Sequence, residues 1–189
     1  MAEAWIIDAA RTPRGIGKQG KGALSHLHPQ HLGATVLNAL KARNGIETRE
    51  VDDVIWGCSS QSGKQGACIG RMSVLAAGWD TQASAVTLDR FCGSGITSVN
   101  FAAASIMSGM EDLVLAGGVE MMSYTATLPR NTLDAGNMHL REQHPQPHQG
   151  VCADVIATLE NIGRDEVDDL ALESQRRAKQ AIEGGYFDR

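Results

Sequence analysis

The sequence has few aromatic residues and no excess of basic ones. Phe, Trp and Tyr make up 4% of its 189 residues, and the formal net charge is −5. Proteins that bind nucleic acid need a positive surface to contact phosphates, and those that bind single strands add aromatic rings on which bases stack. We therefore expect no nucleic-acid partner.

Close cysteine pairs, a leader-like start and a long apolar stretch are also missing. The uncharged segment 91–110 contains glycines, serines, a threonine and an asparagine, which make it too polar to span a membrane, so we expect no membrane association. Residues 1–5 do not form a charged and then apolar leader. The four cysteines are spread along the chain, as Cys58, Cys68, Cys92 and Cys152. These features predict free thiols in a reducing compartment, and we expect a cytoplasmic protein.

A short strand-like run leads into a cysteine, two glycines and a helical segment. Residues 84–88 have the length and β-branched content of a short buried strand. After Cys92, apolar residues recur at three- and four-residue steps as far as Gly109, where a helix would end. Because 91–110 carries no charge, we expect the helix at 93–108 to be central and buried nearly all round.

A cysteine at such a strand-to-helix junction suits acyl transfer. The first turn of a helix presents N–H groups without partners, and together with the helix dipole they favour a thiolate at Cys92. Gly93 and Gly95 leave room for a substrate carbonyl to approach the sulfur and the N–H groups together, as oxyanion stabilisation requires. A cysteine packed in the core beside a glycine turn is the alternative interpretation of Cys-Gly-x-Gly.

The rest of the first 119 residues alternates between expected strands and helices, which is typical of an α/β fold. The expected buried strands cover 5–9, 54–56 and 113–116, and the expected helices cover 31–42 and 69–76. The basic, glycine-rich segment 14–22 lacks the Gly-Lys-Ser/Thr ending of a phosphate loop, so we interpret it as a surface loop.

Residues 120–149 change character, with scattered methionines and prolines but no sustained period. Long connections of this kind are usually functional or disordered. Its histidines, His139, His144 and His148, lack partners at ligand spacing, so we expect no metal site. Two expected helices follow, over 151–162 and 166–183. The second has an expected inward face made of Val167, Leu170, Ala171, Ala178 and Ile182.

With these pieces in order, the chain resembles the thiolase family of acyl-CoA acyltransferases over its whole length. The matching motifs are Asp8-Ala9-Ala10-Arg11-Thr12-Pro13, Cys92-Gly93-Ser94-Gly95, Gly117-Gly118-Val119-Glu120-Met121-Met122-Ser123, and His148-Gln149-Gly150 followed by Ala153-Asp154. The resemblance implies the N-terminal half of a layered α/β fold, with a mixed sheet and a buried central helix. It also implies a core half at 1–119 and a largely helical loop domain at 120–189, both incomplete.

The resemblance further implies an acyltransferase of EC class 2.3.1 that forms or thiolyses a 3-ketoacyl-CoA through an acyl-enzyme on Cys92. Coenzyme A and acyl-CoA would be substrates or products, with no permanently bound cofactor. His148 and Gln149 match positions that line the channel for the pantetheine arm of coenzyme A. Gln149 departs from the methionine of the biosynthetic acetoacetyl-CoA enzymes, which leaves the acyl-chain preference open.

Thiolases have two similar halves, and the resemblance covers the first half with most of the inserted loop domain. In the family, the histidine that activates the nucleophile and the second, acid/base cysteine belong to the other half, in Gly-His-Pro and Cys-x-Gly motifs. We therefore expect this chain alone to be inactive and to need a C-terminal half, supplied as a separate or cleaved polypeptide. A homodimer or homotetramer of complete subunits is implied, with the strand before Cys92 at the dimer contact.

Two other functions remain open on the sequence. A non-catalytic acyl-CoA-binding or scaffold subunit would have no need of the nucleophile, which favours the enzyme. A ketoacyl synthase also places a cysteine at a helix N-terminus. The Gly117-Gly118-x-Glu120 and Gln149-Gly150 pieces weigh against that alternative.

Overall fold

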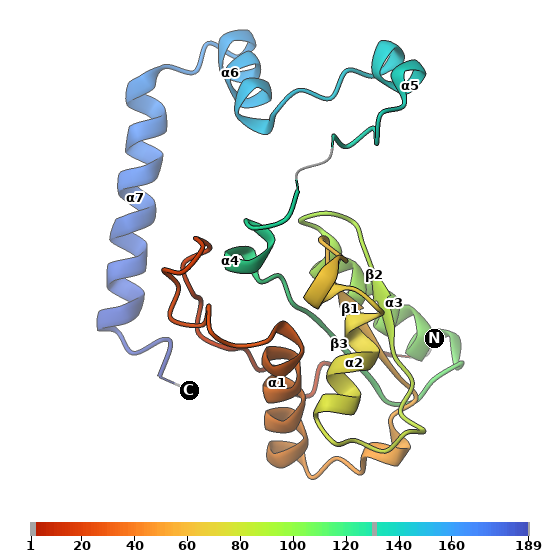
Figure 1. Cartoon of the computed structure of the whole chain (residues 1–189). Helices are drawn as coiled ribbons and strands as arrows, with labels where there is room; N and C mark the ends of the chain where they lie inside the picture. Colours follow the sequence, from red (N-terminus) through yellow and green to blue (C-terminus); the bar gives the residue numbers. More distant parts are fainter. Residues whose placement is uncertain (1–2, 130–131, 189) are drawn as a thin grey trace. The chain divides into compact units, whose positions relative to one another are not determined.

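The computed structural model describes residues 3–129 and 132–188. Its contacts divide the chain into two compact units, the first of which ends at Pro129. The first unit is built on a sheet of three strands, β1 (Asp53–Gly57), β2 (Val86–Leu88) and β3 (Val114–Gly118), in the order β2-β1-β3. The family resemblance implies a mixed sheet. The three strands that the structure describes all run parallel. Gly57 lies opposite Leu88 on one side and Gly118 on the other, so all three strands end at the same edge (Figure 1).

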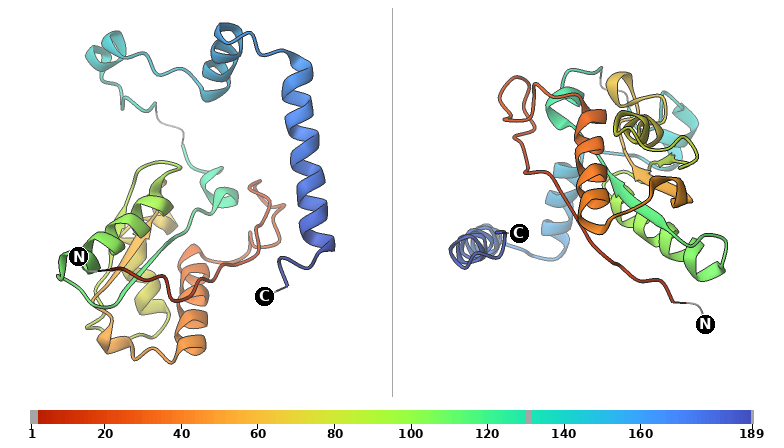
Figure 2. Two further views of the ribbon diagram at one scale, coloured as in Figure 1. Left: turned by 180° about the vertical axis from the view of Figure 1, so that it is seen from behind. Right: turned by 90° about the horizontal axis from the view of Figure 1, so that it is seen from below.

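Helices cover both faces of this sheet, which gives the predicted α/β layering (Figure 2). Helices α1 (Pro29–Asn44) and α2 (Ile69–Ala76) lie on one face and α3 (Ser94–Ser108) on the other. Two short 3₁₀ turns, η1 (Thr48–Glu50) and η2 (Gly63–Gln65), flank β1. The core under α1 and α2 consists mainly of large apolar side chains, among them Leu37, Val54, Trp56, Ile69 and Val74.

Helix α3 is buried on one side only, so the expectation of burial nearly all round is wrong for this chain. The face against the sheet carries small residues, Ser94, Thr97, Ser98 and Ala102. The Ser98 hydroxyl, for example, lies 3.0 Å from the carbonyl oxygen of Gly117 in β3. Large apolar side chains point elsewhere, and Ile96 is 70% exposed. The short strand β2 is not fully buried either, because it forms a sheet edge where Val86 is 44% exposed.

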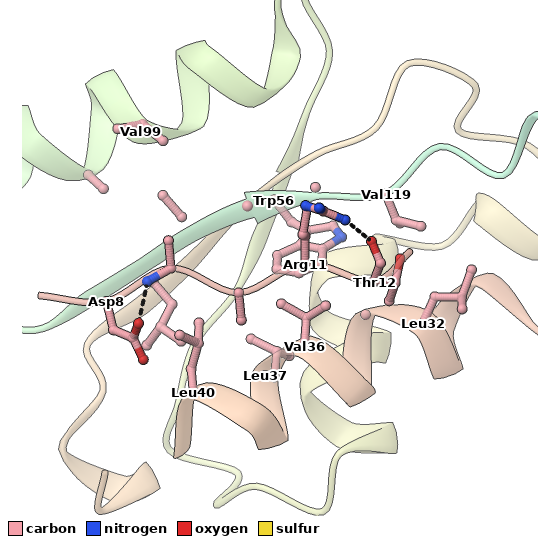
Figure 3. A pocket seen from close by; sticks show the side chains of 18 of the residues that line it. Asp8, Arg11, Thr12, Leu32, Val36, Leu37, Leu40, Trp56, Val99 and Val119 are labelled. Atoms are coloured by element: carbon pink, nitrogen blue, oxygen red, sulfur yellow. Dashed lines mark hydrogen bonds between the residues drawn. The ribbon is translucent and has the colours of Figure 1, made fainter. Parts of the chain in front are cut away.

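The prediction of a first strand at residues 5–9 is also wrong. The segment is extended but belongs to no sheet, and Trp5, Ile6 and Ile7 are 79%, 82% and 76% exposed. It is held instead to the end of α1, where Asn44 donates a side-chain hydrogen bond of 2.9 Å to Asp8. Between this segment and β3 lies a largely apolar groove of about 1360 Å³, into which α1 and α3 also direct side chains (Figure 3).

The edge of β3 that faces residues 5–9 is free, because no backbone ladder joins the two segments. Asp52 donates its N–H to the carbonyl of Leu113, and Val119 donates its N–H to the carbonyl of Gly57. Within residues 113–119, the backbone N–H and C=O groups of the odd-numbered residues therefore face β1. Those of Val114 and Ala116 point the other way, to the groove. Within the described residues β3 pairs with β1 alone, and its second edge is open.

The second unit is helical. It contains α5 (Met138–Gln143), α6 (Gln149–Leu159) and α7 (Arg164–Glu183), whereas α4 (Met122–Thr125) belongs to the first unit. The predicted inward face of α7 is exposed here, with Leu170 at 73% and Ile182 at 67%. Over the described ranges, no helix is both long and apolar enough to cross a membrane. The contact boundary after Pro129 falls ten residues beyond the expected domain limit at 119, which stays a prediction.

Candidate nucleophile site at the start of α3

Cys92 lies in a tight turn between β2 and α3. β2 ends at Leu88 and α3 begins at Ser94, so only five residues reverse the chain direction. Phe91, directly before the cysteine, has a left-handed backbone with φ of +49° although it is not a glycine. A bulky residue in this region is uncommon and costs free energy, and such residues cluster at functional sites. Cys92 itself is exposed.

Ser94 braces this turn through its hydroxyl group. Its Oγ accepts the N–H of Arg90 at 2.8 Å and donates to the carbonyl oxygen of Phe91 at 2.7 Å. The N–H of Phe91 donates to the carboxylate of Asp89 at 2.7 Å. These bonds hold the backbone on both sides of Cys92 without using its sulfur, which leaves the sulfur available for chemistry.

The first turn of α3 is open in front of Cys92. Thr97 is bonded to the carbonyl of Gly93, but the N–H groups of Gly95 and Ile96 lie in the first turn, where no helix carbonyl precedes them. A Cβ placed on Gly95 would meet no heavy atom within 4 Å. The cysteine and these N–H groups are therefore suited to bind a carbonyl carbon and its oxygen, as acyl transfer requires.

Two of the other three cysteines, Cys58 and Cys68, have surroundings that favour a structural role. Cys58 is 1% exposed, and burial, followed by the nearby Glu120 carboxylate, raises the pKa of its thiol to about 12. Cys68 is the N-cap of α2 and has a left-handed backbone. Its sulfur accepts a 3.4 Å hydrogen bond from the Thr87 hydroxyl. The stretch Cys68-Ile69-Gly70 has the letters of a Cys-x-Gly motif, but it lies in the first half of the family pattern. Cys152 lies in the second unit, within α6.

Sequence reasoning missed a polar cluster behind the Cys92 turn. The side chain of Gln65 is fully buried and bonds to Ser60, Glu120 and Met121. In the sequence, Glu120 stands out only as part of the Gly117-to-Ser123 motif. Nothing in the local pattern around Gln65 indicates a buried amide. The cluster became visible only when the fold brought residues 55 positions apart into contact.

The predicted coenzyme A residues lie in the other unit. His148 caps α6, where its Nδ1 accepts the N–H of Gly150 at 3.1 Å, and Gln149 is the first residue of that helix. Both are exposed. The site around Cys92 is thus built from first-unit residues, and the assignment of His148 and Gln149 stays a prediction. Among the residues that the structure describes, no group of three or more His, Cys, Asp or Glu side chains could hold a metal ion.

A family model and two curated relatives match the chain along nearly its whole length. The family described as "Thiolase, N-terminal domain" matches residues 4–189. A steroid 3-ketoacyl-CoA thiolase of Mycobacterium tuberculosis is 38% identical over all of this chain and 48% of its own length. A 3-ketoacyl-CoA thiolase of Psychrobacter cryohalolentis is 35% identical over 97% of this chain and 46% of its own length.

A solved structure is similar in fold as well. The acetyl-CoA acetyltransferase of Bacillus anthracis superposes with a TM-score of 0.82 at 34% identity, covering 100% of this chain and 50% of that one. The chain thus spans about half the length of the relatives that it matches. With the match over 4–189 and the α/β layers that place Cys92 at the head of α3, the chain belongs to the thiolase family.

Proposed function

We propose that this chain supplies the nucleophile of an acyl-CoA C-acyltransferase and that Cys92 is that nucleophile. The observation that carries the proposal is the turn at residues 89–93, which presents an exposed cysteine beside the open first turn of a helix. The names of the similar proteins support the same reaction class, since they are thiolases and an acetyltransferase that use coenzyme A thioesters.

In the proposed reaction, the Cys92 thiolate attacks the thioester carbonyl of an acyl-CoA. A bond forms between sulfur and the carbonyl carbon, the bond from that carbon to the coenzyme A sulfur breaks, and coenzyme A leaves as a thiol after taking up a proton. In this proposal the N–H groups of Gly95 and Ile96 stabilise the oxyanion. A second acyl-CoA, which loses its α-proton to the acid/base group of the other half, then attacks the acyl-enzyme through its α-carbon. The new carbon–carbon bond forms as the bond to the Cys92 sulfur breaks, which releases the thiolate. In the reverse direction, coenzyme A thiolyses a 3-ketoacyl-CoA.

We further propose that His148 and Gln149 contact coenzyme A. Because His148 Nδ1 accepts the Gly150 N–H, the neutral ring carries its proton on Nε2. That N–H is then free to donate to an amide carbonyl of the pantetheine arm. Coenzyme A acts as substrate or product in this proposal, and no permanent cofactor takes part.

A C-terminal thiolase half is the proposed partner that completes the site. Two features of the first unit support it: the exposed apolar face of α3 and the groove at the open edge of β3. The half would supply the activating histidine and the acid/base cysteine that the family resemblance implies. The chain alone would be inactive, and complete subunits would form a homodimer or homotetramer in the cytoplasm.

Trapping of the acyl-enzyme tests the proposal. The chain assembled with a C-terminal half is mixed with acetyl-CoA, and intact-mass and peptide measurements locate the added acetyl group. We expect an acetyl group on Cys92 and none in Cys92→Ser, whereas Cys152→Ser, in the second unit, serves as the matched control and is acetylated normally. Acetylation of another residue, or persistent activity of Cys92→Ser, would contradict the assignment.

A further inference from the structure

The buried side chain of Gln65 joins two loops at the carboxyl edge of the sheet. It is 0% exposed and comes from η2, in the loop that follows β1. Its Nε2 donates to the carbonyl oxygen of Ser60 and to the carboxylate of Glu120, each at 3.0 Å. Its Oε1 accepts the N–H of Met121 at 2.6 Å. The amide thus uses both its donor and its acceptor ends between loop 58–65 and the segment after β3.

Glu120 completes this connection with its second oxygen. That oxygen accepts the N–H of Ser59 at 2.8 Å and the N–H of Ser60 at 3.2 Å. The same segment adds a further bond, because the Tyr124 hydroxyl accepts the N–H of Lys64 at 2.9 Å. We call the pair of Gln65 and Glu120 the loop clamp, since all of these bonds except the one between Gln65 and Ser60 cross from one loop to the other.

The loop clamp reaches the Cys92 turn through two residues of the chain. Gln65 Nε2 also lies 3.5 Å from the sulfur of Cys58, and the Cys58 N–H donates to the carbonyl oxygen of Leu88, the last residue of β2. Gly57, the residue before, lies directly against the backbone of Ser94. Both ends of the turn that carries Cys92 therefore rest on residues 57–58, which the loop clamp holds.

We propose that Gln65 and Glu120 are positioning residues that set the orientation of Cys92 for acyl transfer. They do so by fixing residues 57–58 beneath the turn, without touching the substrate themselves. This inference rests on the proposed function of Cys92. The physical reason is that a displacement of the order of 1 Å between a nucleophile and its oxyanion donors lowers a reaction rate by about 100-fold.

Exchange of the two side chains separates positioning from general stability. Gln65→Glu keeps the size of the side chain but sets a second carboxylate against Glu120, and like charges at this distance repel. The double variant Gln65→Glu with Glu120→Gln restores one donor and one acceptor between the two side chains, while the Ser60 carbonyl loses its donor. Gln61→Ala is the control, because Gln61 is the same residue type in the same loop and is exposed.

The chain assembled with a C-terminal half is assayed for kcat, KM and the rate at which iodoacetamide alkylates Cys92. We expect Gln65→Glu to lower kcat and the alkylation rate by about 10-fold with KM little changed, and the double variant to recover part of both. Gln61→Ala should match the parent. Cys58 serves as an internal monitor of folding, because its thiol is buried and stays unlabelled as long as the fold is intact.

The outcomes distinguish the two proposals. If the parent transfers acyl groups through Cys92 while Gln65→Glu behaves like the parent, the loop clamp has no positioning role and the proposed function stands. The positioning role is equally overturned if the double variant is no better than Gln65→Glu, or if Cys58 becomes labelled along with the loss of rate. A parent protein whose Cys92 is never acylated overturns the proposed function itself.

Discussion

Gly57 and Ser94 lie so close together that no side chain fits between them. A Cβ placed on Gly57 would lie 2.8 Å from the carbonyl carbon of Ser94 and 2.9 Å from its oxygen. Gly57 ends the central strand β1, and Ser94 begins the helix whose first turn faces Cys92. The absence of a single side chain therefore sets how closely α3 approaches the sheet.

Gly57→Ala tests this close approach. The added methyl group meets backbone atoms that cannot rotate away, so α3 must shift. We expect a loss of about 1–3 kcal/mol in the free energy of unfolding, together with slower alkylation of Cys92. Chemical denaturation and thiol labelling measure the two effects. Unchanged stability would mean that α3 can move away from β1 at no cost.

Gly95→Ala is the matched change on the open side of the same helix. A Cβ there meets nothing within 4 Å, and alanine is the better helix former by roughly 0.5–1 kcal/mol. We expect a stability equal to or above that of the parent. Acyl transfer should nevertheless fall, because the methyl group stands where the substrate carbonyl approaches. Full activity in Gly95→Ala would show that the carbonyl enters from another direction.

Selective alkylation tests the difference between the four cysteines. Cys92 is exposed at the head of α3, whereas the thiol of Cys58 is buried and its pKa is raised to about 12. Under limiting iodoacetamide we expect Cys92 to be labelled first and Cys58 last, as read by peptide mass spectrometry. Cys92→Ser should retain the fold, since no hydrogen bond of the turn uses the sulfur. Equal labelling of all four thiols in folded protein would contradict the assignment.

The left-handed backbone of Phe91 predicts a difference between two replacements. In this conformation a Cβ contacts the following carbonyl oxygen and costs about 1–2 kcal/mol, a cost that glycine avoids. Phe91→Gly should therefore fold about as stably as the parent, whereas the β-branched Phe91→Val should be less stable by about 1–2 kcal/mol. Urea unfolding of the two variants provides the comparison, and equal stabilities would argue against the left-handed turn.

Asp134 predicts acid sensitivity in the second unit. Hydrogen bonds from Arg141, then from Thr132 and from the Gly136 N–H, hold the pKa of Asp134 well below its ordinary value. A carboxylate with a lowered pKa in the folded state stabilises fully above its unfolded pKa of about 3.9, and the stabilisation is lost as the pH falls below that value. We expect segment 132–144 to become sensitive to protease in acid. Asp134→Asn should be sensitive already at pH 7 and show little further change.

The exposed apolar face of α3 predicts the behaviour of residues 1–189 alone. The side chains of Ile96, Phe101 and Met107 are 70%, 49% and 52% exposed. We expect the isolated chain to bind a hydrophobic dye and to associate, and a C-terminal half to suppress both. A monomeric, cooperatively folding and dye-negative chain would show that this face needs no partner.

Local patterns were sufficient to predict most helices and the three strands that the structure describes. Helices α1, α2 and α3 were confirmed because their apolar periods end at glycines that adopt the left-handed cap, as Gly45 and Gly109 do. The strands around Ile55 and Leu115 were confirmed because short apolar runs bounded by glycine or charge pair well inside a parallel sheet. The turn at Cys92 was likewise visible, as a strand, a cysteine and two glycines in succession.

Other features were decided by tertiary structure alone. Residues 5–9 have the composition of a strand, but a ladder needs backbone groups in direct contact, and here a groove lies between this segment and the free edge of β3. In α3 apolar residues occur on every side, so its period could not show that Ser94, Thr97 and Ser98 would face the sheet. Small side chains occupy this face because they allow the backbone of α3 to approach Gly57.

The sequence by itself determined the turn that carries Cys92, the proposed nucleophile, because Cys92 and its glycines are neighbours in the chain and their geometry is local. Only the tertiary structure decided what supports that turn. Gln65 and Glu120 are 55 positions apart, and their hydrogen bond exists because parallel strands bring the loops after β1 and β3 to one edge of the sheet. A contact of that kind depends on the packing of the whole first unit, which no short stretch of sequence contains.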